Sequence, residues 1–174
     1  MRGAVAQALG RIGDASAPKE VLALTKDKDS IVAGFALVAA GRLKLAAAQP
    51  AMLDAFKGGD AHTAGEALGY LSEHAPLFAA LATTDAKQWL QREGAIQGLA
   101  ASGDDKAFEA VSAALAKPQV NGGLASAAAA GFVNGHVARG AEPLTKAREQ
   151  LKKAKNASRV EVLDRAIADL GLNQ

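Results

Sequence analysis

The chain has 174 residues, a formal net charge of +2 and no cysteine, so the sequence excludes disulfide bonds and thiolate metal sites. Hydrophobic residues make up 49% of the chain and aromatic residues only 4%, and alanine supplies much of the apolar content. Because small side chains let helices approach closely, this composition favours stacked helices over a bulky core. No apolar run reaches the ~20 residues that a membrane-spanning helix needs.

Apolar residues recur at helical spacing along the whole chain, and Gly, Pro and Asp separate the segments. The pattern predicts helices at 1–13, from Pro18, at 31–45, from Pro50, around 67–71, from Pro76, and at 87–101, 105–116, 120–133, 142–155 and 157–170. Proline begins several short helices because a first-turn position needs no N–H. Breaks are expected at Gly13-Asp14, at Pro118 and at the N-cap turn 83–85. We therefore expect short and long helices in alternation.

One short segment recurs along the chain and determines its organisation. Ala8-Leu9-Gly10-Arg11-Ile12 returns in related form from Ala39, Ala67, Gly98 and Ala129. A spacing of about 30 residues in an apolar chain interrupted by glycine predicts stacked helical repeats. A single helix pair cannot bury its apolar face, so we expect the pairs to form one cooperative array.

The residues from Arg2 to Asp14 read Arg-Gly-Ala-Val-Ala-Gln-Ala-Leu-Gly-Arg-Ile-Gly-Asp. This segment resembles the core of a HEAT-like repeat of the short, phycobilisome-lyase type, a Val-Arg-x-x-Ala-x-x-Ala-Leu-Gly helix with a Gly-Asp turn and a shorter helix. Residues 1–135 fit this scheme, and 140–170 fit only as a helix pair. The third and fifth units, at Asp60 and 122–124, lack the Val-Arg pair. The resemblance implies an all-α fold, a right-handed α-solenoid of about five and a half antiparallel helix pairs.

We expect residues 1–174 to form a single HEAT-like repeat domain that ends in a charged capping pair at 140–174. The first repeat begins with its second helix, which leaves an apolar face open. We interpret the chain as the C-terminal part of a longer one. The alternative is that Met1 is the true start and that the open face forms a dimer. We expect a cytoplasmic location; the alternative is that a signal peptide has been removed from the chain.

Side chains on the second helix of each repeat form the candidate binding surface. The resemblance implies that these helices line a concave face, and positions four residues apart share one face of a helix. Arg and Tyr are frequent anchors of protein interfaces. We expect the partner-binding residues to be Arg11, Arg42, Glu66, Tyr70, Trp89, Arg92 and Phe132. In the alternative interpretation Tyr70 and Phe132 are packing residues, the arginines are solvated, and Trp89 fills the core between repeats.

The sequence offers little for catalysis. There is no Gly-x-Ser-x-Gly motif. Glycine pairs such as Gly34/Gly41 and Gly65/Gly69 fit close helix contacts rather than phosphate loops, because no strand precedes them. His62 and Glu66 have a spacing that suits metal ligands, but no second His lies near them in the sequence. We therefore expect a non-enzymatic protein with no cofactor and no metal.

Two other functions remain open beside a scaffold or adaptor that binds a protein or peptide. Residues 139–174 carry eight basic and five acidic side chains, and clustered cations can follow a nucleic-acid backbone. The candidate contacts are Lys146, Arg148, Lys152, Lys153, Lys155 and Arg159. The simpler interpretation is a solvated cap helix whose lysines suit its C-terminal dipole. The resemblance also implies a second alternative, an accessory subunit of a bilin lyase.

Overall fold

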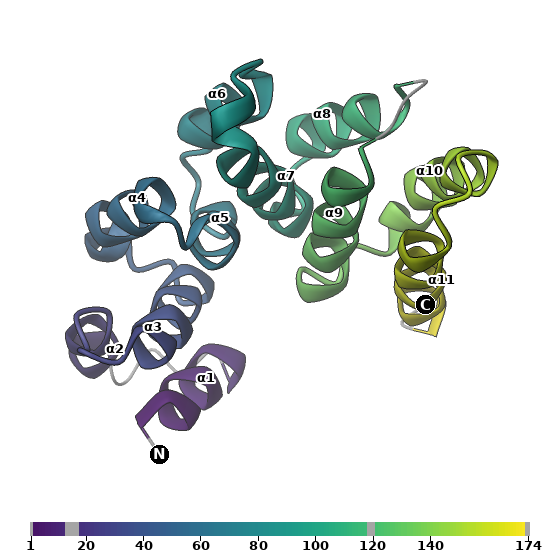
Figure 1. The fold of residues 1–174 in the computed structure, drawn as a ribbon. Coiled ribbons are helices and arrows are strands. Elements are labelled where there is room, and N and C mark those ends of the chain that lie inside the picture. The colour runs from purple at the N-terminus through teal and green to yellow at the C-terminus, as the bar shows by residue number, and fades with distance from the viewer. Residues whose placement is uncertain (1, 13–17, 118–120, 173–174) are drawn as a thin grey trace. The chain divides into compact units, whose positions relative to one another are not determined.

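The computed structural model describes residues 2–12, 18–117 and 121–172 (Figure 1). Within these ranges every regular element is helical, with eleven α-helices and three short 3-10 helices, so the predicted all-α class is confirmed. None of the described helices is long and apolar enough to cross a lipid bilayer. The chain divides into two compact units, Met1–Gly98 and Leu99–Gln174. The breaks expected at Gly13-Asp14 and Pro118 lie outside the described residues.

Unit 1 is a double layer of helices. Its elements are α1 (Arg2–Ile12), α2 (Pro18–Leu24), α3 (Ser30–Arg42), α4 (Gln49–Gly58), α5 (Ala61–Gly69), α6 (Ala75–Ala82) and most of α7 (Trp89–Ser102), with 3-10 turns η1 (Ala46–Ala48) and η2 (Ala86–Gln88). Helix α3 packs between α1 and α5, while α2 packs on α3, and α4 and α6 pack on α5. Met52, Leu68 and Leu77 are fully buried in the core of this unit.

The expected alternation of short and long helices holds only in part. Helix α4 has 10 residues and α5 has 9, because α5 ends at Gly69, before the predicted Leu71. Helix α7 begins two residues later than predicted, since the Asp85 carboxylate accepts a hydrogen bond from the Lys87 N–H and stabilises a 3-10 turn there.

Unit 2 contains the end of α7 and four further helices. They are α8 (Asp105–Leu115), α9 (Gly122–Asn134), α10 (Ala141–Lys153) and α11 (Ala157–Leu172), with the 3-10 turn η3 (Ala138–Gly140) before α10. Helix α11 packs on both α9 and α10, and α8 packs on α10. Leu144 and Leu163 are fully buried, whereas the acids and bases of α10 and α11 lie on the outside.

Helices α5 and α7 meet through glycines in unit 1. Gly65 and Gly69 lie one turn apart on α5, and Gly94 and Gly98 lie one turn apart on α7. A Cβ atom at Gly65 would collide with the carbonyl group of Gly94, and a Cβ at Gly69 with that of Gly98. Because glycine has no Cβ, the two backbones come into direct contact.

Close glycine contacts also join α3 to α5 and α1 to α3 in unit 1. A Cβ at Gly41 on α3 would collide with the backbone of Ala67 on α5, and a Cβ at Gly10 on α1 would lie 2.6 Å from the Cα of Ala39. The predicted close helix contacts at Gly41, Gly65 and Gly69 are therefore confirmed. The glycine of the recurring segment serves as the contact point between successive helices of one layer.

We predict that Gly65→Ala destabilises the protein by about 1–3 kcal/mol, because the new methyl group forces α5 away from the backbone of α7. Gly58→Ala, at the end of α4, is the matched control. Its Cβ meets nothing within 4 Å, so it should leave stability unchanged or raise it by up to ~1 kcal/mol. Urea unfolding of both variants measures the difference. Equal stabilities for the two variants would contradict the tight contact.

Candidate functional site

Six polar side chains from three neighbouring helices meet on one face of unit 1, and we call them the polar stripe. Helix α5 contributes His62 and Glu66, and Tyr70 is the C-cap residue directly after it; the three recur every fourth residue and so share one face. The other members are Arg42 at the end of α3, and Glu93 and Gln97 on α7. The glycine contacts bring these helices close enough for their polar side chains to reach one another.

The carboxylate of Glu66 is the centre of the polar stripe, and its residue is only 6% exposed. It accepts a hydrogen bond from Gln97 Nε2 at 3.0 Å and one from the Tyr70 hydroxyl at 3.4 Å. Arg42 Nη2 lies 3.6 Å from Glu66 Oε1 and donates to the Tyr70 hydroxyl at 3.4 Å. The guanidinium also lies over the Tyr70 ring, 5.3 Å from its centroid. One buried acid therefore holds side chains from three helices.

Gln97 joins Glu66 to His62. A carboxylate accepts hydrogen bonds, so the Gln97 amide turns its NH₂ group toward Glu66 and its oxygen toward His62. This oxygen lies 3.0 Å from His62 Nδ1, and Nδ1 is therefore the donor. His62 Nε2 lies 3.4 Å from a carboxylate oxygen of Glu93. The polar stripe thus runs in one chain of contacts from Glu93 through His62, Gln97 and Glu66 to Tyr70 and Arg42.

Tyr70 titrates abnormally within this arrangement. Burial of the phenol raises its pKa above the ordinary value, and the negative charge of Glu66 raises it further. The positive charge of Arg42 acts in the opposite direction, but it does not cancel the other two effects. The phenol therefore stays protonated and keeps its hydrogen bond to Glu66 over the whole physiological range.

Two of the other predicted contact residues, both arginines, are not members of the polar stripe. Arg11 is exposed near the end of α1. Arg92 is half-buried, and its Nε is buried without a hydrogen-bond partner among the described residues. It lies five residues before Gln97, which places it about 140° away around α7. The side chain of Arg92 therefore does not share the face of Gln97.

Both aromatic residues predicted outside the polar stripe require a correction. Phe132 on α9 is fully buried, so the prediction that it lines a binding surface is wrong. Its ring packs 5.9 Å from the ring of Phe108 and directly against Gly140, and these neighbours cover it. Trp89 is 54% exposed, so the alternative that it fills the core is wrong as well. Its part in binding a partner stays a prediction.

Sequence reasoning missed part of the polar stripe. The spacing of His62 and Glu66 suggested metal ligands, but the neighbours of His62 are Gln97 and Glu93. No group of three His, Cys, Asp or Glu residues within the described ranges could hold a metal ion. The usable signal was the pairing of two Gly-x-x-x-Gly segments, 65–69 and 94–98, with polar residues beside them. That pattern places Glu66 next to Gln97.

Apolar side chains continue the same face on α3. Ile31 and Phe35 precede Arg42 by eleven and seven residues, which places them on its side of the helix. They are 68% and 38% exposed. The face therefore presents exposed apolar groups beside half-buried polar ones.

The basic residues of α10 and α11 are interleaved with acids. Lys146 binds Glu142 at 2.7 Å, Arg148 binds Asp164 at 2.9 Å, and Lys152 binds Glu149 at 3.2 Å. Hydrogen bonds from the two lysines lower the pKa of Glu142 and of Glu149. Arg159 donates to the Ser126 hydroxyl, and Lys153 and Lys155 are exposed. This surface is one of mixed charge, which does not favour nucleic acid as its ligand.

A comparison of the chain with models of protein families gives no match, and a comparison with curated proteins gives none either. The functional interpretation therefore depends on the geometry of the polar stripe itself.

We predict that Glu66→Ala lowers the free energy of unfolding by about 1–3 kcal/mol, since Gln97, Tyr70 and Arg42 all lose their shared acceptor. Glu73→Ala removes an exposed carboxylate from the following loop and should change stability by less than about 0.5 kcal/mol. Chemical denaturation of both variants tests the difference. A cost for Glu66→Ala no larger than for Glu73→Ala would show that the buried carboxylate does not join the helices.

Tyr70 is the only tyrosine of the chain, so its ionisation can be followed directly by tyrosinate absorbance. We expect a midpoint above the ordinary value of a free tyrosine, and a lower midpoint in Glu66→Gln, where the negative charge is gone. The protonated phenol makes its full contribution to the free energy of unfolding below the ordinary tyrosine pKa. This contribution is lost as the pH rises through the elevated pKa of Tyr70 in the folded protein, because the unfolded chain releases the proton more easily. A normal midpoint in the folded protein would contradict the burial of the phenol.

Proposed function

We propose that the protein is a non-enzymatic scaffold or adaptor built from HEAT-like repeats, and that the polar stripe lies at the centre of the surface that binds a partner protein. The observation that carries this proposal is the arrangement of Arg42 and Tyr70. Both side chains remain partly accessible, and both are held by a buried carboxylate.

This arrangement reduces the entropic cost of binding. An exposed, flexible Arg or Tyr loses rotamer freedom when a partner immobilises it, at about 0.5–1.5 kcal/mol for each side chain. In the polar stripe, the contacts with Glu66 and the stacking of Arg42 on Tyr70 have already restricted both side chains. Arg and Tyr are also the residue types that most often dominate the binding energy of interfaces.

The apolar neighbours supply the second component of such a surface. Protein interfaces combine a desolvated apolar centre with polar groups that determine orientation. Ile31 and Phe35 lie along α3 on the side of Arg42 and are exposed. A partner that covers them would at the same time exclude water from the Arg42–Tyr70 pair.

The local chemistry supports binding over acid–base catalysis. Both oxygens of the Glu66 carboxylate are engaged, Oε2 by Gln97 and Oε1 by Tyr70 and Arg42, and the residue is only 6% exposed, so a substrate has little access to it. A general base needs an open approach.

The proposal includes a HEAT-like solenoid of about five and a half helix pairs. Two observations within unit 1 support it. Successive helices α1, α3, α5 and α7 contact each other at the glycines of the recurring segment or beside them. Helices α2, α4 and α6 pack against this layer, α2 on α3 and both α4 and α6 on α5. The polar stripe would then lie on the inner face of the array.

The test is affinity capture of partners with wild-type protein and with the double variant Arg42→Ala/Tyr70→Ala. We expect a partner captured by the wild type to be retained at least about tenfold less by the double variant, because two anchor residues are lost. Val162→Ala/Arg165→Ala is the matched control. It removes an exposed apolar residue and an exposed arginine from α11 in unit 2 and should leave capture unchanged.

Circular dichroism first establishes that each variant is folded. Ile31→Ser, a variant outside the polar stripe, should also weaken capture of the partner. Hydrogen exchange of the complex should show protection in α3, α5 and α7. Equal capture by the double variant and the control, or protection confined to α8–α11, would overturn the proposal. Capture that disappears equally in all variants at high salt would instead indicate a nucleic-acid ligand.

A further inference from the structure

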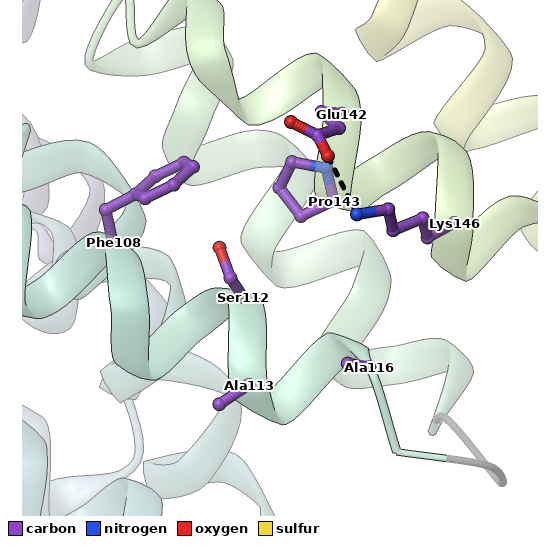
Figure 2. A pocket seen from close by; sticks show the side chains of 7 residues that line it. All are labelled: Phe108, Ser112, Ala113, Ala116, Glu142, Pro143 and Lys146. Atoms are coloured by element: carbon purple, nitrogen blue, oxygen red, sulfur yellow. Dashed lines mark hydrogen bonds and ion pairs between the residues drawn. The ribbon is translucent and has the colours of Figure 1, made fainter.

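A pocket of about 370 Å³ lies in unit 2 between α8 and α10 (Figure 2). Its walls are mostly apolar, formed by Phe108, Ala113 and Ala116 on α8 and by Pro143 on α10. This volume falls at the lower end of the range for small-molecule sites. The pocket uses no residue of the polar stripe, so a ligand could bind here whether or not the polar stripe binds a partner.

The aromatic wall of the pocket is fixed in place. The Arg139 guanidinium lies over the Phe108 ring, 4.3 Å from its centroid, and the buried ring of Phe132 packs on the same side chain at 5.9 Å. Arg139 is held in turn by the carbonyl oxygen of Gly103 at 2.9 Å and by the carboxylate of Asp105. A wall that needs no rearrangement lowers the cost of binding a ligand.

Ser112 is the unusual member of the pocket. Its hydroxyl oxygen is buried and has no hydrogen-bond partner among the described residues. Figure 2 shows the Ser112 side chain on α8, on the wall of the pocket that faces Pro143. A buried hydroxyl without a partner costs stability, and native proteins contain few of them. Alanine would fill the same helical position without that cost.

The charged groups at the pocket are already satisfied. Glu142 and Lys146 both line it, and they bind each other at 2.7 Å (Figure 2). A ligand would therefore need no charge of its own. The ligand would need one hydrogen-bonding group that can reach Ser112, on an apolar molecule that fits between Phe108 and Pro143.

We propose that the α8–α10 pocket binds a small, neutral, mainly apolar molecule that carries one hydroxyl group, and that Ser112 recognises this group. Rotation about the Cα–Cβ bond of Ser112 is sufficient to turn its hydroxyl toward a bound ligand. The hydroxyl of the ligand then forms the hydrogen bond that Ser112 makes with no described residue.

The test compares p-cresol with toluene, which differ by one hydroxyl group, in two-dimensional amide NMR titrations of the full chain. We expect p-cresol to shift the amide signals of α8 and α10 and to bind more tightly than toluene.

Ser112→Ala should weaken p-cresol binding by about three- to tenfold, the effect of one hydrogen bond, and leave toluene binding unchanged. Ala113→Leu should abolish the binding of both, because the larger side chain fills the pocket. Ala130→Leu, at an exposed alanine of α9, is the matched control and should bind as the wild type does.

Thermal unfolding supplies a second, independent readout. Without ligand, Ser112→Ala should raise the midpoint by about 2–4 °C, because it removes a buried hydroxyl that has no partner. Shifts outside α8 and α10, no shifts with either compound, or an equal loss of p-cresol and toluene binding in Ser112→Ala would overturn the proposal. A lower midpoint for Ser112→Ala would also overturn it, since the hydroxyl would then have a structural partner.

Discussion

The direct backbone contact between α5 and α7 is the constraint on which the arrangement of unit 1 depends. Gly65 and Gly69 face Gly94 and Gly98, and a single methyl group at any of these positions would collide with the opposite backbone. Helices this close place the side chains beside the contact within hydrogen-bond distance. The 3.0 Å bond between Glu66 and Gln97 is therefore a consequence of four residues that have no side chains.

A buried carboxylate is costly unless every neighbour compensates for its lost hydration. Glu66 satisfies this condition with an amide, a phenol and a guanidinium taken from three different helices. The same contacts that stabilise the acid also restrict Arg42 and Tyr70, the side chains we propose as anchors for a partner. Stability of the helix layer and preorganisation of the binding surface thus have one physical origin.

The sequence predicted most helices, because Pro50 and Pro76 fall in the first turns of α4 and α6. It placed the start of α7 too early, because Asp85 caps the 3-10 turn η2 rather than α7. It also predicted the glycine contacts and the shared face of Glu66 and Tyr70, since both follow from helical periodicity. It failed for Phe132, and the alternative in which Trp89 fills the core was wrong as well. The repeat spacing identifies equivalent positions in successive helices but does not show whether a side chain is buried. The burial of Phe132 depends on tertiary neighbours such as Phe108 and Gly140. The partners of His62 required the register between α5 and α7, which periodicity does not contain.

The most direct test of the link between α5 and α7 is a double-mutant cycle between Glu66 and Gln97, with Glu66→Ala, Gln97→Ala and the double variant compared by chemical denaturation. We expect the two residues to stabilise each other by about 1 kcal/mol or more, as is usual for a buried, charge-assisted hydrogen bond across helices. A coupling energy of zero would show that α5 and α7 are not joined through these side chains, and the polar stripe would then lack the support that makes it a binding surface.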